Sequence, residues 1–235
     1  MRTLSVNGTV LDDNITLLSI NYGYASVTNY NDWLKYSLQP QWYRQDITYT
    51  TAEMELLVEA DSITELEKAC SDVYALMRGE ATVRDSLSDF SLVGHITSCE
   101  DTKLNSKARV ITISFEGIKE GDEKTISSLT IPGRTGTTVE VEGNADVPCK
   151  ITITPDTSYV TLTLVINGNE YQFANVNATM TLVLDSVNGL ILNGEDSAVS
   201  LYQSWSMPYL QGGTNTIACL EGYPSIEITY NGRWM

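Results

Sequence analysis

The chain has few basic residues and almost no histidine: among 235 residues it contains 14 Lys and Arg, 30 Asp and Glu, and one His. The resulting formal net charge of −16 disfavours sequence-independent nucleic-acid binding, which depends on Lys and Arg to neutralise phosphates. No apolar run approaches the length of a membrane span. The N-terminal residues turn polar before a signal-peptide core can form. We therefore expect a protein that is made in the cytoplasm and is not secreted by a signal peptide.

Cysteine is also scarce, with Cys70, Cys99, Cys149 and Cys219 spread along the chain. None belongs to a CxxC pair, and none lies near His95 at a spacing typical of metal ligands. The pattern favours four buried, small apolar side chains in a reducing compartment. One disulfide between a spatially adjacent pair is the open alternative.

Catalytic patterns are missing as well. A Ser/His/Asp triad would depend wholly on His95, which lies in a strand-like segment, and no GxSxG motif is present. Adjacent carboxylates on a strand point to opposite faces, so such pairs do not form a glycosidase site by themselves. The pairs are Asp12-Asp13, Glu100-Asp101 and Glu195-Asp196. The segment from Asp185 to Gly189 faintly resembles a calcium loop, but Val187 breaks that pattern and a hairpin turn fits better. We expect no enzyme activity, no metal and no cofactor.

One segment, from Ser62 to Arg78, is predicted to be a long helix. Ser62 and Glu65 have the spacing of a capping box, and Gly79 is suited to end the helix in a left-handed conformation. Apolar residues recur at helical spacing and predict one buried stripe. They are Ile63, Leu66, Ala69, Cys70, Val73, Leu76 and Met77.

The other N-terminal patterns favour strands. Apolar residues alternate with glutamates at Met54, Leu56 and Val58, as expected for a strand with one solvent-exposed face. Further strands are predicted at 90–98 and 109–115. With the helix at about 62–78, these patterns predict an α+β domain over residues 1–121.

The C-terminal half shows no helical pattern. Residues 117–124 are polar and glycine-containing, which is typical of a linker. Beyond them, apolar segments flank Asn167-Gly168 and Asn188-Gly189 and predict two hairpins. Short strands at this spacing indicate an all-β sandwich or jelly roll over residues 122–235.

Aromatic residues gather in two places. Tyr22, Tyr24, Trp33, Trp42 and Tyr43 belong to a Tyr- and Trp-rich N-terminal stretch, which suits either domain packing or a subunit interface. In the second half, Trp205 and Tyr209 could stack on sugar faces, as in a carbohydrate-binding module.

A family resemblance rests on the C-terminal residues. The run from Ser204 to Ile217 contains Pro208-x-Leu210-x-x-Gly213-x-Asn215-x-Ile217, and the last strand, 225–234, ends in Arg233-Trp234. This resembles the closing signature of siphophage distal tail proteins. The preceding segments, 181–185 and 190–194, resemble the family's preceding hairpin. Upstream, the similarity is looser and includes Leu4 to Gly8 and Ile113 to Phe115.

The resemblance implies a structural phage or prophage tail protein. Residues 1–121 would be a belt-type β-sandwich with one long helix, and six such domains would form a ring, a hexamer. Residues 122–235 would be a galectin-like sandwich. The ring would be a hub that joins the tail tube to the tail tip, baseplate and receptor-binding proteins, within the virion. DNA would pass through an acidic lumen without specific binding. The alternative is a carbohydrate-binding β-sandwich module for host-surface glycans.

Two further expectations concern residues within this scheme. A closed ring needs two different complementary faces on each subunit, and the candidate subunit interface is Tyr22, Tyr24, Trp33, Trp42 and Tyr43. In the C-terminal domain, Gly212-Gly213 would permit a tight turn, and Trp205 and Trp234 would fill the end of the sandwich.

Overall fold

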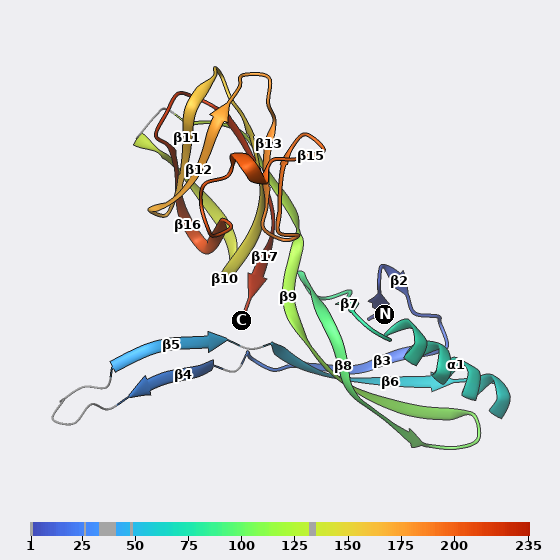
Figure 1. Ribbon diagram of the computed structural model, residues 1–235. Helices are drawn as coiled ribbons and strands as arrows, with labels where there is room; N and C mark the ends of the chain where they lie inside the picture. Colours follow the sequence, from blue (N-terminus) through green and yellow to red (C-terminus); the bar gives the residue numbers. More distant parts are fainter. Residues whose placement is uncertain (1, 26, 33–40, 48, 132–134) are drawn as a thin grey trace. The chain divides into compact units, whose positions relative to one another are not determined.

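The protein is mainly β, with two compact units in its computed structural model, Met1–Glu120 with Met235 and Gly121–Trp234 (Figure 1). The structure describes residues 2–25, 27–32, 41–47, 49–131 and 135–235, with the backbone alone at 27–32, 41–47, 128 and 130. No helix in these described ranges is long and apolar enough to cross a membrane.

The first unit is an antiparallel sheet with one helix. Its elements are β1 (Leu4–Val6), β2 (Thr9–Val10), β3 (Ile15–Tyr22), β4 (Val27–Asp32), β5 (Gln41–Ile47), β6 (Thr50–Glu59), α1 (Ile63–Leu76), β7 (Ala81–Asp85), β8 (Phe90–Lys103) and β9 (Ala108–Thr130). The strands of the main sheet follow the order β3-β6-β9-β8-β7-β1-β2, whereas β4 and β5 pair with each other in a separate two-stranded sheet. Strand β9 continues into the second unit beyond residue 120.

Helix α1 begins where the sequence predicts it and ends at Leu76, two residues before the predicted Arg78. Ser62 is its N-cap, with the hydroxyl accepting from the Glu65 N–H at 3.3 Å, and Gly79 just beyond its C-terminus has a φ of 83°. Leu66 and Val73 pack with Met54 and other β6 residues in one apolar cluster. The buried stripe is narrower than predicted, because Ile63 is 56% exposed and Leu76 39% exposed.

The second unit is all-β apart from one short 3-10 turn in the part that is described. Its elements are the end of β9, β10 (Thr137–Thr154), β11 (Tyr159–Ile166), β12 (Asn169–Val176), β13 (Leu182–Asp185), β14 (Leu190–Asn193), β15 (Asp196–Ser197), η2 (Val199–Leu201), β16 (Tyr209–Cys219) and β17 (Ser225–Trp234). One layer has the order β12-β11-β16-β10; in the other, β10 pairs with β13 and β17. Side chains from both layers form one apolar core.

Strand β10 belongs to both layers because it changes partner along its length. Its first part pairs with β16, and its second part pairs with β17 and β13. Gly143 lies at the change: its φ is 110°, and a Cβ there would be 2.1 Å from the Arg233 carbonyl oxygen. A Cβ on Gly212 would in turn lie 2.5 Å from the Gly143 carbonyl oxygen, so glycine is required on both strands at this crossing.

The predicted hairpins are confirmed. Asn167 and Gly168, with φ values of 49° and 85°, connect β11 to β12, as expected for a two-residue turn with both φ values positive. The turn after β13 is held by the Asp185 carboxylate, which accepts hydrogen bonds from the Val187 and Asn188 N–H groups at 3.0 Å. This segment is therefore a hairpin turn, as expected.

Two sequence predictions are wrong. Residues 117–124 form part of strand β9 and are not a flexible linker. Gly117 packs against β8, where a Cβ would lie 2.5 Å from the Val93 carbonyl oxygen, and Lys119 is only 7% exposed. Of the four cysteines, all unpaired, only Cys149 and Cys219 are buried, whereas Cys70 is half-buried and Cys99 is exposed.

Candidate subunit interface

Tyr22 and Tyr24 are the candidate interface residues whose side chains the structure describes, and they lie at the end of β3 and just beyond it. The Tyr22 ring is half-buried and meets the edge of Phe90 with a centroid distance of 5.1 Å. Its hydroxyl lies 3.5 Å from the Ser88 hydroxyl. Burial raises the pKa of the Tyr22 hydroxyl, so this side chain is a neutral, anchored ring at neutral pH.

A buried lysine organises this aromatic group. Lys119 Nζ lies 5.6 Å from the Tyr22 and Tyr24 ring centroids and 5.7 Å from that of Phe90. Burial lowers the pKa of the Lys119 ammonium. The charged form is stabilised by cation–π attraction to these rings and by a 3.2 Å hydrogen bond to the Gly23 carbonyl oxygen.

Gly23 is held on both of its main-chain polar groups. Its N–H donates to the Thr51 carbonyl oxygen at 2.7 Å, while its own carbonyl accepts from Lys119. A Cβ at this position would lie 2.4 Å from the Thr51 hydroxyl oxygen. The backbone that precedes β4 is therefore tied closely to β6 and β9.

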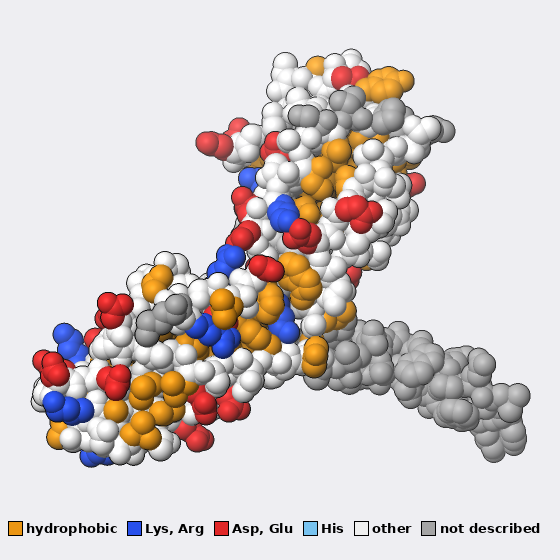
Figure 2. Space-filling view, turned by 180° about the vertical axis from the view of Figure 1, so that it is seen from behind, with side chains coloured by type: hydrophobic (Ala, Val, Ile, Leu, Met, Phe, Trp, Pro, Cys, Tyr) orange, Lys and Arg blue, Asp and Glu red, His pale blue; other side chains and the backbone are white. Residues whose placement is uncertain are grey.

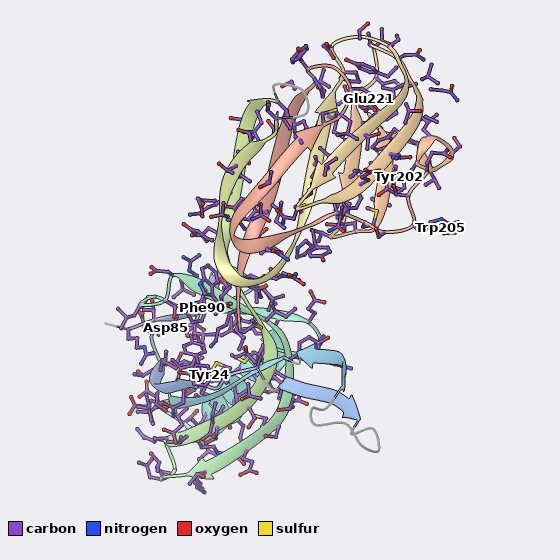
Figure 3. All side chains as sticks on the ribbon, turned by 90° about the vertical axis from the view of Figure 1, so that its left-hand side faces the viewer. Tyr24, Asp85, Phe90, Tyr202, Trp205 and Glu221 are labelled. Carbon is purple, nitrogen blue, oxygen red and sulfur yellow. The ribbon has the colours of Figure 1, made fainter. Side chains whose placement is uncertain are left out.

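An ion pair lies beside Tyr22. Arg2 donates to the Asp85 carboxylate from Nε at 2.8 Å and from a terminal nitrogen at 2.5 Å, and Asp85 is only 2% exposed. The Arg2 hydrogen bond holds the pKa of Asp85 below its usual range. Figure 3 shows Asp85, Phe90 and Tyr24 in the first unit.

The structure brings together some of the predicted interface residues. Tyr22 and Tyr24 share the Lys119 contact, and Tyr24 is 84% exposed, an unusually open position for a large ring. Trp42 and Tyr43 lie on β5, where the pairing shifts by one residue opposite Tyr30 and Asn31, and the structure describes only their backbone. Trp33 lies outside the described residues.

Lys119 and Phe90 were not predicted from the sequence as part of this group. A usable signal existed: Ile113, Phe115, Gly117 and Lys119 alternate along the chain and are all buried. This alternation places them on one face of a strand, whereas the charged residues from Glu116 onward give the segment the composition of a linker.

The closing motif of the sequence has a structural role. Asn215 is fully buried, and its side chain accepts from the Gln211 N–H at 2.8 Å and donates to the Gln211 and Gly213 carbonyl oxygens at 2.7 and 3.0 Å. It also accepts from the Asn167 amide at 2.8 Å. Gly213, with a φ of 96°, shapes an irregular place within β16 and not a separate turn.

One of the two tryptophans of this segment, Trp205, does not lie where it is expected. Trp205 is completely exposed and does not fill the end of the sandwich. Trp234 is half-buried, and its ring leaves no room for a Cβ on Gly121, which would lie 2.9 Å from it. The core is filled instead by residues such as Leu210 and Ile217, which are buried in a common cluster as predicted.

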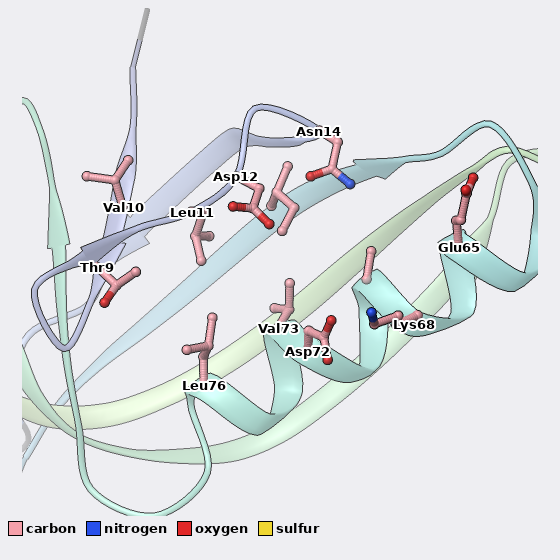
Figure 4. Close-up of a pocket in the computed structure, with 12 residues that line it drawn as sticks. Thr9, Val10, Leu11, Asp12, Asn14, Glu65, Lys68, Asp72, Val73 and Leu76 are labelled. Carbon is pink, nitrogen blue, oxygen red and sulfur yellow. The ribbon is translucent and has the colours of Figure 1, made fainter.

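A hollow lies in the first unit, between α1 and the segment that follows β1 (Figure 4). It has a volume of about 230 Å³ and combines apolar residues such as Leu11 and Val73 with the charged Asp12, Lys68 and Asp72. It includes none of the predicted interface residues. Across the described parts of the chain, no group of three or more His, Cys, Asp or Glu side chains could hold a metal ion.

These features define a class: a two-unit, mainly β protein whose first unit carries one helix and a separate two-stranded sheet. A solved structure with this fold is SPP1 Dit (gp 19.1), described as a paradigm of the hub adsorption apparatus in phages that infect Gram-positive bacteria. The two share 12% identity and a TM-score of 0.79, with 100% of each chain covered. The predicted resemblance to distal tail proteins is thus confirmed at the level of fold.

Two weaker similarities are to chains of the phage P2 baseplate in its activated conformation. One structure, with Ca, gives 10% identity and a TM-score of 0.49 over 99% of this chain and 98% of the other. The second, with Sr, gives 12% identity and a TM-score of 0.45 over 97% and 98%. No protein-family model and no curated protein matches the sequence.

Proposed function

We propose that the protein is a structural distal tail protein of a phage or prophage, and not an enzyme. Six copies form a ring-shaped hub in the virion that joins the tail tube to the tail tip, the baseplate and the receptor-binding proteins. The observation that carries this proposal is the shared fold with SPP1 Dit over the full length of both chains, at a TM-score of 0.79. At this level of identity fold does not fix function, so the role needs a direct test.

In the proposed ring, the first unit supplies the contacts between subunits. Tyr24 is a large exposed ring whose neighbouring backbone at Gly23 is held by Thr51 and Lys119. A preorganised aromatic side chain loses little conformational freedom when it is buried by a partner. The β4–β5 pair lies next in the chain, and an isolated two-stranded sheet is only marginally stable in water without further packing.

The second unit faces the other tail proteins in this proposal.

The acidic charge of the chain, with acidic side chains on the visible face of both units in Figure 2, suits a lumen through which DNA slides without binding. A measured ring with a neutral or basic lumen would remove this part of the proposal.

The test is the mass of the purified full-length chain by native mass spectrometry, with negative-stain images of the same sample. We expect closed rings with about six times the 25.9 kDa mass of one chain. Tyr24→Ala should shift the population toward smaller species, because it removes the exposed ring. The matched control is Tyr223→Ala, which removes a ring that is 62% exposed in the second unit and should leave the rings intact.

Assembly can also depend on the tail itself, so purified tails provide a second measurement. Labelling the chain on tails should place it in a ring at the distal end of the tube. A monomer in solution combined with absence from the tail tip would contradict the hub. Equal assembly of the Tyr24→Ala and Tyr223→Ala variants would contradict only the proposed interface.

A further inference from the structure

The second unit carries an exposed aromatic ring that the proposed hub does not use. Trp205, between η2 and β16, has a relative exposure of 103%, so its side chain is as open as in an extended peptide. Figure 3 shows it pointing away from the ribbon. It makes no hydrogen bond or ring contact with the described residues. Burying such a ring would remove a large apolar area from water, so its open position requires a reason.

The backbone around Trp205 is held in place although the ring itself is free. Gln203 N–H donates to the Gln172 carbonyl oxygen at 2.9 Å. The Ser204 hydroxyl accepts from the Gln172 N–H at 3.0 Å and donates to the Glu170 carbonyl oxygen at 3.2 Å. These bonds fasten the segment to the edge of β12 on one side of Trp205.

The other side of the segment is anchored by Tyr202. Its hydroxyl donates to the Ser206 carbonyl oxygen at 2.6 Å, and its ring packs on Phe173 with a centroid distance of 5.2 Å. Trp205 is therefore presented by a preorganised turn, so binding through its ring would need little ordering of the backbone.

A pocket lies beside the ring. Its volume of about 440 Å³ falls within the range of about 300–1,000 Å³ that is typical of small-molecule sites. Its lining combines apolar, amide and hydroxyl groups and contains no charged residue. The lining residues are Ile191, Val199, Tyr202, Gln203, Ser204, Trp205, Ser206 and Met207.

The free polar groups of the pocket are neutral. Gln203 and Ser206 are exposed, and their side chains make no hydrogen bond to any residue in the described ranges. With the indole N–H of Trp205, they provide an amide, a hydroxyl and a ring donor around one aromatic face. This set can pair with hydroxyl groups of a ligand that are both donors and acceptors.

The lining excludes some ligand classes. An anionic polymer would need Lys or Arg, and the pocket has neither. The charged residue that is joined to the lining by a hydrogen bond is the acidic Glu170, whose carbonyl oxygen accepts from the Ser204 hydroxyl. A stable protein interface buries about 800 Å² per partner around an apolar centre. Here Val199, at 60% exposure, is the other strongly exposed apolar residue of the lining, which is too little for such a centre.

We propose that Trp205, Gln203 and Ser206 form a binding site for a neutral saccharide, one sugar ring stacking on the Trp205 indole while its hydroxyls pair with Gln203 and Ser206. Tyr209, the second aromatic expected at such a site, is 41% exposed but does not line the pocket. The site lies in the second unit alone, so it does not depend on the assembly of subunits into the proposed hub.

The test is the binding of neutral trisaccharides to the full-length chain, measured by saturation-transfer NMR and by tryptophan fluorescence. The probes are maltotriose, cellotriose and chitotriose, with trigalacturonate as the anionic comparison. We expect saturable binding of at least one neutral probe and an affinity at least tenfold weaker, or no binding, for trigalacturonate. Trp205→Ala should lower the affinity for the neutral probe by about tenfold or more.

Trp205→Ala should keep the parent's circular dichroism and melting temperature, because the ring contacts no described residue. Trp205→Phe should retain part of the binding, and Tyr223→Ala, which removes an exposed ring elsewhere in the same unit, should bind as the parent does. The proposal is overturned if no neutral probe binds, or if Trp205→Ala binds as tightly as the parent. It is also overturned if Trp205→Ala only weakens binding to another tail protein. None of these outcomes bears on whether the subunits form a hub, which native mass spectrometry tests separately.

Discussion

Asn215 shows how one side chain can determine local backbone geometry. It is buried inside β16 and satisfies the N–H and carbonyl of Gln211 and the carbonyl of Gly213, while Asn167 binds it from the β11–β12 turn. An apolar residue of the same size could fill the space but could not pair with these groups. The sequence motif that contains Asn215 therefore describes a folding requirement of the second unit, and not a binding site.

Asn215→Ala is expected to destabilise the second unit, because it leaves buried main-chain groups unpaired. Each such group costs about 1–3 kcal/mol. Urea unfolding of the parent and the variant would measure the difference in the free energy of unfolding. Asn169→Ala, at an exposed position of β12, is the matched control and should change stability by less than about 0.5 kcal/mol. Equal stabilities for the two variants would contradict this role.

Trp205 shows where reasoning from single residues fails. A large aromatic near the C-terminal strands is expected to be buried, since that is where its area contributes most to stability. Whether it points inward depends on the turn that holds it, here through Ser204 and Tyr202. The Ser204 hydrogen bond joins residues 32 positions apart, so it leaves no periodic signal in the sequence.

At the scale of elements, local signals gave reliable predictions. The Ser62 cap, the Gly79 stop and the Asn-Gly turn at 167–168 act within a few residues, so their chemistry can be read directly from the sequence. Strand β9 could not be predicted in the same way. Its polar segment is held by contacts with β8 and by the aromatic rings around Lys119, and those partners come from distant parts of the chain.

The contact between β8 and β9 leads to a prediction for Gly94. A Cβ at this position would lie 2.0 Å from the Glu116 carbonyl oxygen and 2.5 Å from the Gly117 Cα, both rigid main-chain atoms. Gly94→Ala should therefore force the strands apart and destabilise the first unit by about 1–3 kcal/mol. Thermal unfolding would measure the loss, with Thr97→Ala at an exposed position of the same strand as the control. A Gly94→Ala variant that melts like Thr97→Ala would show that the two strands can separate freely.

At the scale of the whole molecule, the two units have separate apolar cores. One cluster contains residues from Leu4 to Phe115, and the other contains residues from Ile131 to Tyr230. Among the residues that the structure describes, no buried residue belongs to both clusters. The units are covalently joined through β9, yet the burial that stabilises each one is its own.

This separation predicts that damage to one core stays local. Leu56 is fully buried in the first core, so Leu56→Ala should cost about 2–5 kcal/mol through lost burial and the cavity left behind. Hydrogen exchange followed by mass spectrometry should show faster exchange in β3, β6 and α1, while β11 and β16 keep the protection of the parent. Ile151→Ala, at a fully buried position of the second core, is the reciprocal control and should reverse the pattern. Faster exchange throughout the chain in either variant would mean that the two units unfold as one cooperative body, and stability could then not be assigned to each unit separately.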